Sequence, residues 1–333
     1  MKIIDGEHID PVLWADLVKK SPVATWFQTQ EAYGFYDSLS FLEAFALGIE
    51  NGGKLKGVVV GFVQKDGGKL KQFLSRRAIV NGGPLLAADI TDEELAFLLS
   101  AMIERLKKKA IFIETRNFND YRRWKPVFEK CGFDYEQHYD VQVDTSSMEM
   151  INSKLDRNRK RNIKKALDNG VVIDEKPSVE DLRQLYSMLE ELYATKVKTP
   201  LFPFEFFEKL SKIPSSQFFL ARNTEDQLLG GLICVELEHR AVYAWFACGD
   251  DNNYRPLSPS VMVNYAGVSY AAREGAPRFD FMGAGKPDDG GYGVRDFKLK
   301  FGGELLELGR YQFVCNRLLF GIGKLGVKIL KKR

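Results

Sequence analysis

The order of predicted elements repeats between the two halves of the chain, and this repeat constrains the fold more than any single motif. The pattern of each half predicts an apolar hairpin with glycine turns, a helix, a short strand, a second helix and a last strand. Residues 55–61 match residues 229–235, and residues 127–132 match residues 296–302. We therefore expect an α/β (α+β) protein with two tandem copies of one module, each a mixed sheet with helices on it. The alternative is chance similarity between amphipathic elements.

The length supports two domains, because 333 residues exceed what one hydrophobic core normally organises. The repeat predicts a first domain at 1–150 and a second at 151–315, followed by a basic, apolar tail at 316–333.

Local patterns predict individual elements within each copy. Thr91–Lys109 is expected to be a helix with Thr91 as N-cap, and Glu94 completes a capping box. Four further expectations bear on the topology: helical spacing in 27–50, a hairpin of 56–64 with 70–74, a last strand of the first copy through Val141 and Val143, and a last strand of the second copy at 307–313.

Composition and charge exclude several kinds of site. The net charge of +3 is too small to imply nucleic-acid binding by itself. The four cysteines form no C-x-x-C pair and the three histidines are scattered, so we expect no metal site, no cofactor and no Ser-His-Asp triad. The N-terminus carries charges where a signal peptide needs an apolar core, and no run approaches the roughly 20 apolar residues of a membrane span. We expect a cytoplasmic protein that could also attach to the inner face of a membrane.

A basic segment at 153–170 lies at the junction of the two copies. It is predicted to be a helix with Ser153 as N-cap, in which Arg157, Arg161 and Lys165 recur every four residues on one face. Arginine presents a planar fork of donors that suits phosphate oxygens. The segment therefore predicts a site for a diphosphate or an RNA backbone, the alternative being a solvated helix that joins two domains.

A glycine-rich loop follows a strand in the second copy. Asp280 lies in the strand, residues 283–285 read Gly-Ala-Gly, and Asp288 and Asp289 follow in the loop. Glycines at a strand end allow the backbone to approach a ligand closely. The loop lacks G-x-G-x-x-G, so it is not a dinucleotide-binding motif, and a purely structural loop is the alternative.

The block at 293–303 closes the second copy and carries Lys298 directly after this loop. Acyl transfer to an amine needs a stabilised oxyanion, and a lysine ammonium aimed at the carbonyl can supply it. We expect Lys298 to do this, with Asp280 and Tyr292 as groups that handle a proton or orient the substrate. The alternative is a surface lysine on an amphipathic helix. The first copy has Glu129 where the second has Lys298, so the reacting centre is expected in the second copy.

Three blocks together resemble the Fem family. They are R-N-I-K-K-A at 161–166, F-D-F-M-G-A-G at 279–285 and Y-G-V-R-D-F-K-L-K-F-G-G at 292–303, and the F-Q-T at 27–29 is similar to the family's opening. The resemblance covers nearly the whole chain. It implies two GNAT-like (acetyltransferase-like) domains in tandem, and transfer of amino acids from aminoacyl-tRNA to the peptide of peptidoglycan precursors.

The resemblance also implies roles for single residues. Arg161 matches the arginine that binds the precursor's phosphate, and Phe297 with Lys298 matches the pair beside the reacting centre. Arg295, in the same block, is a further expected substrate contact. The family's lysine after the N-terminal aromatic has no counterpart at 33–37, which departs from the family's diphosphate site. No long heptad stretch exists that could form the coiled-coil arm of some members.

The turn at 250–259 bears on the acyl donor. Acetyl-CoA enzymes hold pyrophosphate on a glycine-rich turn that opens a helix. This turn has no glycine after Gly249, and its two prolines remove backbone donors, which argues against ordinary CoA binding. In the Fem-like interpretation Tyr254 and Arg255 instead face the substrate cleft.

The sequence thus predicts an N-acyltransferase that resembles the aminoacyl-tRNA-dependent Fem enzymes and acts on a lipid-linked or nucleotide-linked envelope precursor. One alternative is an acyl-CoA- or carrier-dependent N-acyltransferase of an envelope polysaccharide amine. Another is a non-catalytic binding protein of the same fold. The tail at 316–333 is expected either to lie on an anionic membrane or to dock on the protein.

Overall fold

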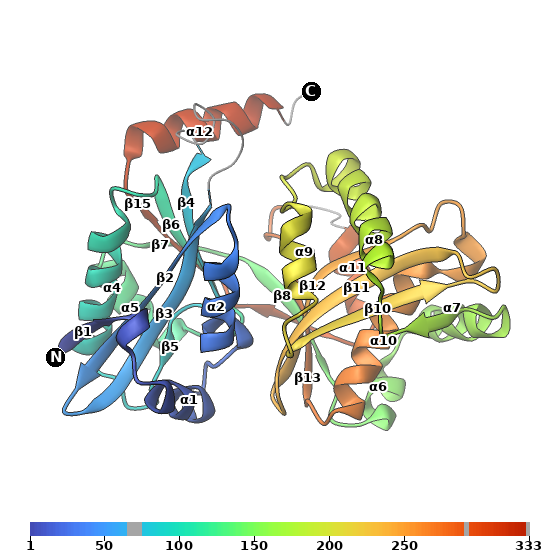
Figure 1. Cartoon of the computed structure of the whole chain (residues 1–333), viewed down its shortest axis with the longest axis horizontal. Coiled ribbons are helices and arrows are strands. Elements are labelled where there is room, and N and C mark those ends of the chain that lie inside the picture. The colour runs from blue at the N-terminus through green and yellow to red at the C-terminus, as the bar shows by residue number, and fades with distance from the viewer. Residues whose placement is uncertain (65–74, 290–292, 331–333) are drawn as a thin grey trace. The chain divides into compact units, whose positions relative to one another are not determined.

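The computed structural model describes residues 1–64, 75–289 and 293–330, with only the backbone of 324–330. The chain divides into two compact units (Figure 1). The first comprises Met1–Gln137 and Leu308–Arg333, and the second comprises His138–Glu307. None of the described helices combines the length and the apolar character needed to cross a bilayer.

In the first unit the described strands form one mixed sheet in the order β1-β2-β3-β4-β6-β15-β7, with β5 paired to β3. Its elements are β1 Lys2–Asp5, α1 Pro11–Lys20, α2 Gln30–Ser38, β2 Leu42–Asn51, β3 Lys54–Gln64, β4 Arg77–Asn81, β5 Leu85–Leu86, α4 Asp92–Leu106, β6 Phe112–Arg116, α5 Lys125–Lys130, β7 Asp134–Glu136, β15 Arg310–Val314 and α12 Arg317–Leu330.

In the second unit the described strands form another mixed sheet in the order β14-β8-β13-β12-β11-β10-β9. Its elements are β8 Tyr139–Asp144, α6 Met148–Lys154, α7 Arg157–Asp168, β9 Val172–Asp174, α8 Val179–Leu192, α9 Phe204–Leu210, β10 Ser216–Arg222, β11 Leu228–Leu237, β12 Ala241–Gly249, α10 Pro259–Arg273, β13 Arg278–Gly283, α11 Gly293–Leu299 and β14 Glu304–Glu307.

The helix α4 forms where the sequence predicts it, and the predicted capping box begins it. Thr91 and Glu94 make a reciprocal capping box, with Thr91 N donating to Glu94 at 2.9 Å and Glu94 N donating to Thr91 Oγ1 at 3.2 Å. The helix buries one apolar face in the first core: Leu95, Leu98, Leu99, Met102 and Leu106.

Two expectations in the first unit were wrong or lie outside the described residues. The helical spacing of 27–50 covers only α2, and the chain then enters β2, a long strand that pairs with β3. The hairpin partner of β3 is therefore β2. Leu70–Leu74, expected in that place, lies outside the described residues. Pairing of β2 with β1 and β3, together with burial of residues 45–49, overrides the helical spacing of this segment.

The last strand of each predicted copy differs from expectation. The strand through Val141 is β8, and it lies in the second sheet between β14 and β13. The segment 307–313 is two strands, β14 in the second sheet and β15 in the first, so the second unit begins at His138 rather than at residue 151. The break falls at Gly309, where φ is +67° and a Cβ would lie 2.2 Å from the ring of Tyr135. Only glycine fits this bend between the two sheets.

The parallel strand pair differs between the two sheets. In the first unit β4 and β6 pair along five positions, from Arg77 with Phe112 to Asn81 with Arg116. In the second unit the pairing of β12 with β13 comprises Val242 with Phe279 and Tyr243 with Asp280, both near the strand starts. Beyond these positions the described parts of β12 and β13 share no ladder.

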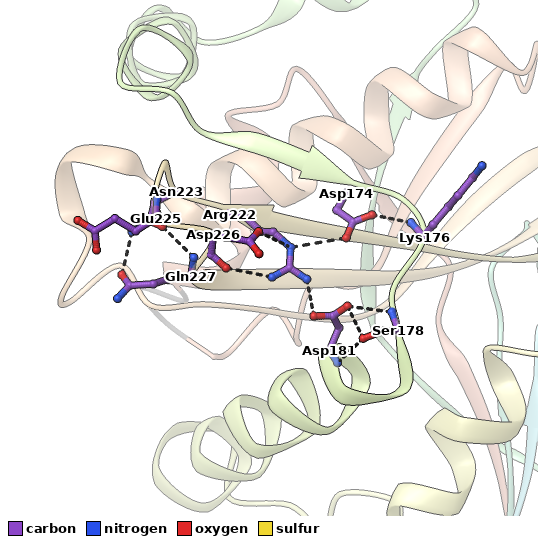
Figure 2. A network of polar contacts seen from close by, with 9 residues as sticks. All are labelled: Asp174, Lys176, Ser178, Asp181, Arg222, Asn223, Glu225, Asp226 and Gln227. Atoms are coloured by element: carbon purple, nitrogen blue, oxygen red, sulfur yellow. Dashed lines mark hydrogen bonds and ion pairs between the residues drawn. The ribbon is translucent and has the colours of Figure 1, made fainter.

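An arginine at the end of β10 joins three segments of the second unit. Figure 2 shows Arg222 among the carboxylates of Asp174, Asp181 and Asp226. Asp181 also completes the capping box of α8 with Ser178. The Arg222 side chain is only 12% exposed, so its charge interacts with little screening by water. The network ties β9 and the start of α8 to the β10–β11 turn.

Arg222→Met should lower the free energy of unfolding by about 2–3 kcal/mol, because three carboxylates then face one another without a cation. Urea denaturation followed by circular dichroism measures this. Lys212→Met removes a lysine whose side chain is 70% exposed, and it should change stability by less than about 0.5 kcal/mol. Equal losses in the two variants would mean that the Arg222 network adds no specific stability.

Candidate active site

Strand β13 ends in an irregularity that shapes the site. Its pairing with β8 shifts between Asp280 and Gly283. Met282 within the shift has φ +55°, a left-handed conformation that costs a side-chain-bearing residue roughly 1–2 kcal/mol. The Asp280 carboxylate accepts a hydrogen bond from Met282 N at 2.7 Å and holds this turn. We call residues 281–283 the β13 bulge.

Lys298 on α11 inserts its ammonium into the β13 bulge. Its Nζ donates to the carbonyls of Phe281 at 2.7 Å, Met282 at 3.2 Å and Gly283 at 2.7 Å. An ammonium has three hydrogens, so the bulge engages all of them. Lys298 is therefore not a surface residue of an amphipathic helix. Lys298 holds the three carbonyls of the bulge together and places a positive charge next to them.

Two buried carboxyls lie beside this lysine. Asp140 on β8 is 3% exposed and Asp280 on β13 is fully buried. Burial raises the pKa of both groups, and the neighbouring Asp280 charge raises that of Asp140 further. The two side chains hydrogen-bond to each other, and Gln142 Nε2 donates to Asp280 at 2.9 Å.

The pair balances the charge of Lys298. Burial lowers the pKa of Lys298 to about 8, while Asp140 and Asp280 oppose that shift by favouring the ammonium. Lys298 is thus mostly charged at pH 7 and loses its proton as the pH rises through about 8. Sequence reasoning singled out Asp280 and missed Asp140, because the strand that carries Asp140 was assigned to the other copy.

Asp280→Asn should lower the pKa of Lys298 below about 8, since it removes a negative charge that favours the ammonium. NMR titration of the lysine side-chain signals, with Lys298 assigned by substitution, measures the midpoint. Asp296→Asn removes an exposed carboxylate from the same helix and should leave the midpoint in place. A native midpoint near the ordinary lysine value, or no decrease in Asp280→Asn, would contradict the coupling.

A basic cavity of about 570 Å³ lies in the second unit. Its lining includes the expected residues Arg161, Lys165, Arg255 and Phe297, and the full lining is Arg159, Arg161, Asn162, Lys165, Asp251, Arg255, Pro256, Ser258, Val261 and Phe297. Arg157, expected on the same face of α7, is exposed and lies outside this lining. The concentration of guanidinium and ammonium groups suits an anion.

Arg159 is the cavity residue that sequence reasoning missed. Its guanidinium lies 4.3 Å from the ring centroid of Phe297 and 5.3 Å from that of Phe301, and it donates to Phe297 O at 3.3 Å. Burial lowers the pKa of Arg159, and Asp156 and Asp251 oppose that shift. The contact joins the basic block to the closing block, two motifs that the sequence presents separately.

The start of α7 also fits against the closing block. The N-cap is Asp156, whose carboxylate accepts from Asn158 N and Arg159 N, so the expected cap at Ser153 was wrong. Ser153 lies inside α6, a separate short helix. Asp156 N donates to Lys300 O at 3.0 Å. Gly302 has φ +83°, and a Cβ there would come within 2.8 Å of the Lys154 backbone, which explains the F-G-G ending.

The N-terminus of α10, where a CoA pyrophosphate would be expected, already has an acceptor. Ser260 N donates to the Asp251 carboxylate at 3.2 Å. A Cβ on Gly249 would lie 2.5 Å from the same nitrogen, so the end of β12 packs directly on the helix start. A bound carboxylate and close packing disfavour a further anion at this position.

The remaining expected residues have other partners or are not described. The Tyr254 hydroxyl hydrogen-bonds to Gln227 Oε1 at 3.1 Å, and Tyr254 is not part of the cavity lining. Arg295 donates to Ala284 O at 2.9 Å and Lys286 O at 2.5 Å, so it holds the loop after β13. Tyr292 lies outside the described residues.

No cluster of three or more His, Cys, Asp or Glu residues that could hold a metal ion exists within the described part of the chain.

One family model matches within the second unit. Residues 153–298 match the acetyltransferase (GNAT) domain, a span that runs from the basic block to Lys298. No curated protein sequence matches the chain.

Three solved structures are similar to this chain over nearly its whole length. The crystal structure of FemX is 15% identical, with 97% of this chain and 99% of that chain covered and a TM-score of 0.73. L-PGS from Bacillus licheniformis is 13% identical, with 97% of each chain covered and a TM-score of 0.57. A tandem GNAT protein from the clavulanic acid biosynthesis pathway is 10% identical, with 95% and 98% covered and a TM-score of 0.58.

At these identities the likeness establishes the fold, which is the tandem GNAT-like fold expected from the resemblance to the Fem family. The family match in the second unit supports an acyltransferase.

Proposed function

We propose that the chain is an N-acyltransferase that moves an aminoacyl group from aminoacyl-tRNA to an amine of a phosphate-bearing envelope precursor, since residues 153–298 match the acetyltransferase (GNAT) domain. The precursor is lipid-linked or nucleotide-linked. The reacting centre lies at the β13 bulge of the second unit, and the basic cavity holds phosphate.

One observation carries the proposal. Phe297 lines the basic cavity, and the next residue, Lys298, holds the β13 bulge. The helix α11 thus connects the basic cavity, which suits phosphate, with the β13 bulge, where the Lys298 ammonium meets three backbone carbonyls. Acyl transfer from or to a phosphate-bearing molecule needs both features within one site.

The chemistry follows from the ester nature of the donor. The amine nitrogen attacks the acyl carbonyl carbon, the C–N bond forms, and the ester C–O bond breaks. The proton lost by the amine passes to the leaving oxygen. Negative charge develops on the carbonyl oxygen, and the positive charge of Lys298 stabilises it. Asp280 and Asp140 keep that lysine charged near neutral pH.

The α10 start favours a donor other than acyl-CoA. Asp251 and Gly249 fill the helix N-terminus, whereas Arg159, Arg161, Lys165 and Arg255 remain around the cavity. Phosphate is therefore bound through side chains instead of helix amides. This arrangement fits a phosphodiester or a precursor diphosphate better than a CoA pyrophosphate at the helix end.

Incubation with charged tRNA pools and, separately, acyl-CoA pools, with envelope precursors as acceptors, should yield an amide product from the tRNA donors, detected by mass spectrometry. Lys298→Met should lower kcat by roughly 10²–10³-fold, because it removes charge stabilisation of the transition state. Lys300→Met, in the exposed neighbouring lysine, should retain turnover. Thermal melts establish that each variant is folded.

A product from acyl-CoA alone, together with saturable CoA binding by calorimetry, would support the CoA-dependent alternative. No product from any donor would support the non-catalytic binding protein. Unchanged turnover in a folded Lys298→Met enzyme would remove Lys298 from the mechanism.

We also propose that α12 attaches the enzyme to an anionic membrane that carries its acceptor. The helix start docks on the first unit, since Phe320 packs edge-on against Phe112 with centroids 5.4 Å apart. Leu318 and Ile322, one turn apart, remain 74% and 47% exposed. Residues 316–333 carry lysines and arginines and no acidic residue. Exposed apolar side chains beside basic ones suit the interface of an anionic bilayer.

Cosedimentation with phosphatidylglycerol-containing vesicles should capture the protein, and Leu318→Ser with Ile322→Ser should reduce capture several-fold. Phosphatidylcholine vesicles serve as the neutral control. Equal capture of the double variant and the parent chain would mean that α12 only docks on the protein.

A further inference from the structure

The sheet of the second unit is apolar on one face of β13 and polar on the other. Phe279 and Phe281 on β13 pack into the core of the second unit together with Val242 of β12. Side chains alternate between the two faces of a strand, so the residues between these apolar ones lie on the other face. We call the polar set on that face the β13 polar layer. It consists of Arg278, Asp280, Tyr243, Gln142 and Asp140.

The strand register brings the centre of the β13 polar layer together. Asp280 pairs with Tyr243 on β12 and with Gln142 on β8. Asp280 and Tyr243 are both fully buried. Water therefore cannot solvate a charge on Asp280, and neighbouring groups have to balance it.

Arg278 is the member of this layer that the proposed reaction does not yet use. Its Nη2 donates to the Tyr243 hydroxyl at 3.0 Å, and its guanidinium lies 5.9 Å from the centroid of that ring. Burial raises the pKa of Tyr243 to about 12, so the hydroxyl keeps its proton at neutral pH. A neutral hydroxyl thus fixes the guanidinium without cancelling its charge.

The charge of Arg278 acts on Asp280, two positions further along the same face. Burial raises the pKa of Asp280, and among the neighbouring groups Arg278 opposes that shift most. The Asp280 carboxylate accepts hydrogen bonds from Met282 N in the β13 bulge and from Gln142 Nε2. Its negative charge also favours the ammonium form of Lys298. Protonation of Asp280 would weaken both effects.

We propose that Arg278 is a positioning residue for acyl transfer, which keeps Asp280 a carboxylate beside the β13 bulge and so retains the Lys298 ammonium there. The two buried carboxyls of Asp140 and Asp280 face the single ammonium of Lys298, and Arg278 supplies the second positive charge. Arg278 acts through these groups and not on the reacting atoms. This inference rests on the proposed function, because it assigns Arg278 a part in that reaction.

Arg278→Met should raise the pKa of Asp280, since it removes the charge that favours the carboxylate. Carbon-13 NMR titration of the aspartate carboxyl signals in the full-length protein, with Asp280 assigned through Asp280→Asn, measures the midpoint without substrate. Arg278→Lys keeps the charge and should retain a midpoint close to that of the parent chain. Arg273→Met removes an arginine of the same unit whose side chain is 54% exposed, and it should leave the midpoint in place.

The pH profile of acyl transfer separates positioning from mere stability. Because protonated Asp280 no longer supports Lys298, kcat should fall as the pH drops through the pKa of Asp280. In Arg278→Met this acid limb should move to higher pH, which lowers kcat on the limb by roughly 3- to 10-fold. An arginine that served stability alone would lower the melting temperature and leave the limb in place.

Tyr243→Phe keeps the ring and removes the hydroxyl that fixes Arg278. It should move the Asp280 midpoint in the same direction as Arg278→Met, by a smaller amount. This variant keeps the proposal testable if Arg278→Met does not fold.

Two results would overturn the proposal: an unchanged Asp280 midpoint in Arg278→Met and Tyr243→Phe, or equal shifts in Arg278→Met and Arg278→Lys. The titration needs no acyl transfer, so it fails independently of the proposed function. Acyl transfer with an unchanged midpoint and acid limb would reject the role of Arg278 and retain the function. A shifted midpoint without transfer from any donor would reject the function and retain the coupling of Arg278 to Asp280.

Discussion

The site depends on one interaction, the capture of the Lys298 ammonium by three carbonyls of the β13 bulge. Converging carbonyl oxygens repel one another, and a left-handed methionine at Met282 adds strain, so the bulge needs a cation to persist. The cation is in turn buried and needs negative charge nearby, which Asp280 and Asp140 supply. The strand end, the helix α11 and the buried carboxyl pair thus stabilise one another, and removing any one member leaves an uncompensated group.

Among the described residues the lysine-filled bulge lies in the second unit, and the two parallel strand pairs differ in a way that fits this placement. β4 and β6 remain paired to their ends, so their backbone groups are occupied by the sheet. β12 and β13 separate after two pairs, and β13 then continues into the bulge whose carbonyls hold Lys298. The first unit has the sheet and helices of the same module, with Glu129 at the position that corresponds to Lys298.

Local signals were sufficient for much of the fold. The capping box at Thr91 and the helix α4 that it begins follow from short-range pattern and were predicted close to their observed bounds. Lys298 and Arg161 were singled out in the sequence because they lie in distinctive blocks. Asp140 and Arg159 were missed because their roles depend on contacts with residues more than a hundred positions away, Asp280 and Phe297. The sequence did not predict that β8 lies in the second sheet and β15 in the first, because both have the pattern of ordinary strands. A short turn at Gly309 separates β14 from β15.

β15 follows the second unit in sequence but belongs to the sheet of the first unit, and this arrangement affects folding during synthesis. The second unit is continuous in sequence and is inserted between two parts of the first, so its sheet can close while the chain is still being synthesised. The first sheet cannot, because β7 pairs with β15, and β15 is made only after the whole second unit. Until then the edge of β6 stays open, as a template for pairing with other chains. The unit whose synthesis begins first therefore completes its sheet after the second unit has been made, and a nascent chain depends on residues 310–314 to do so.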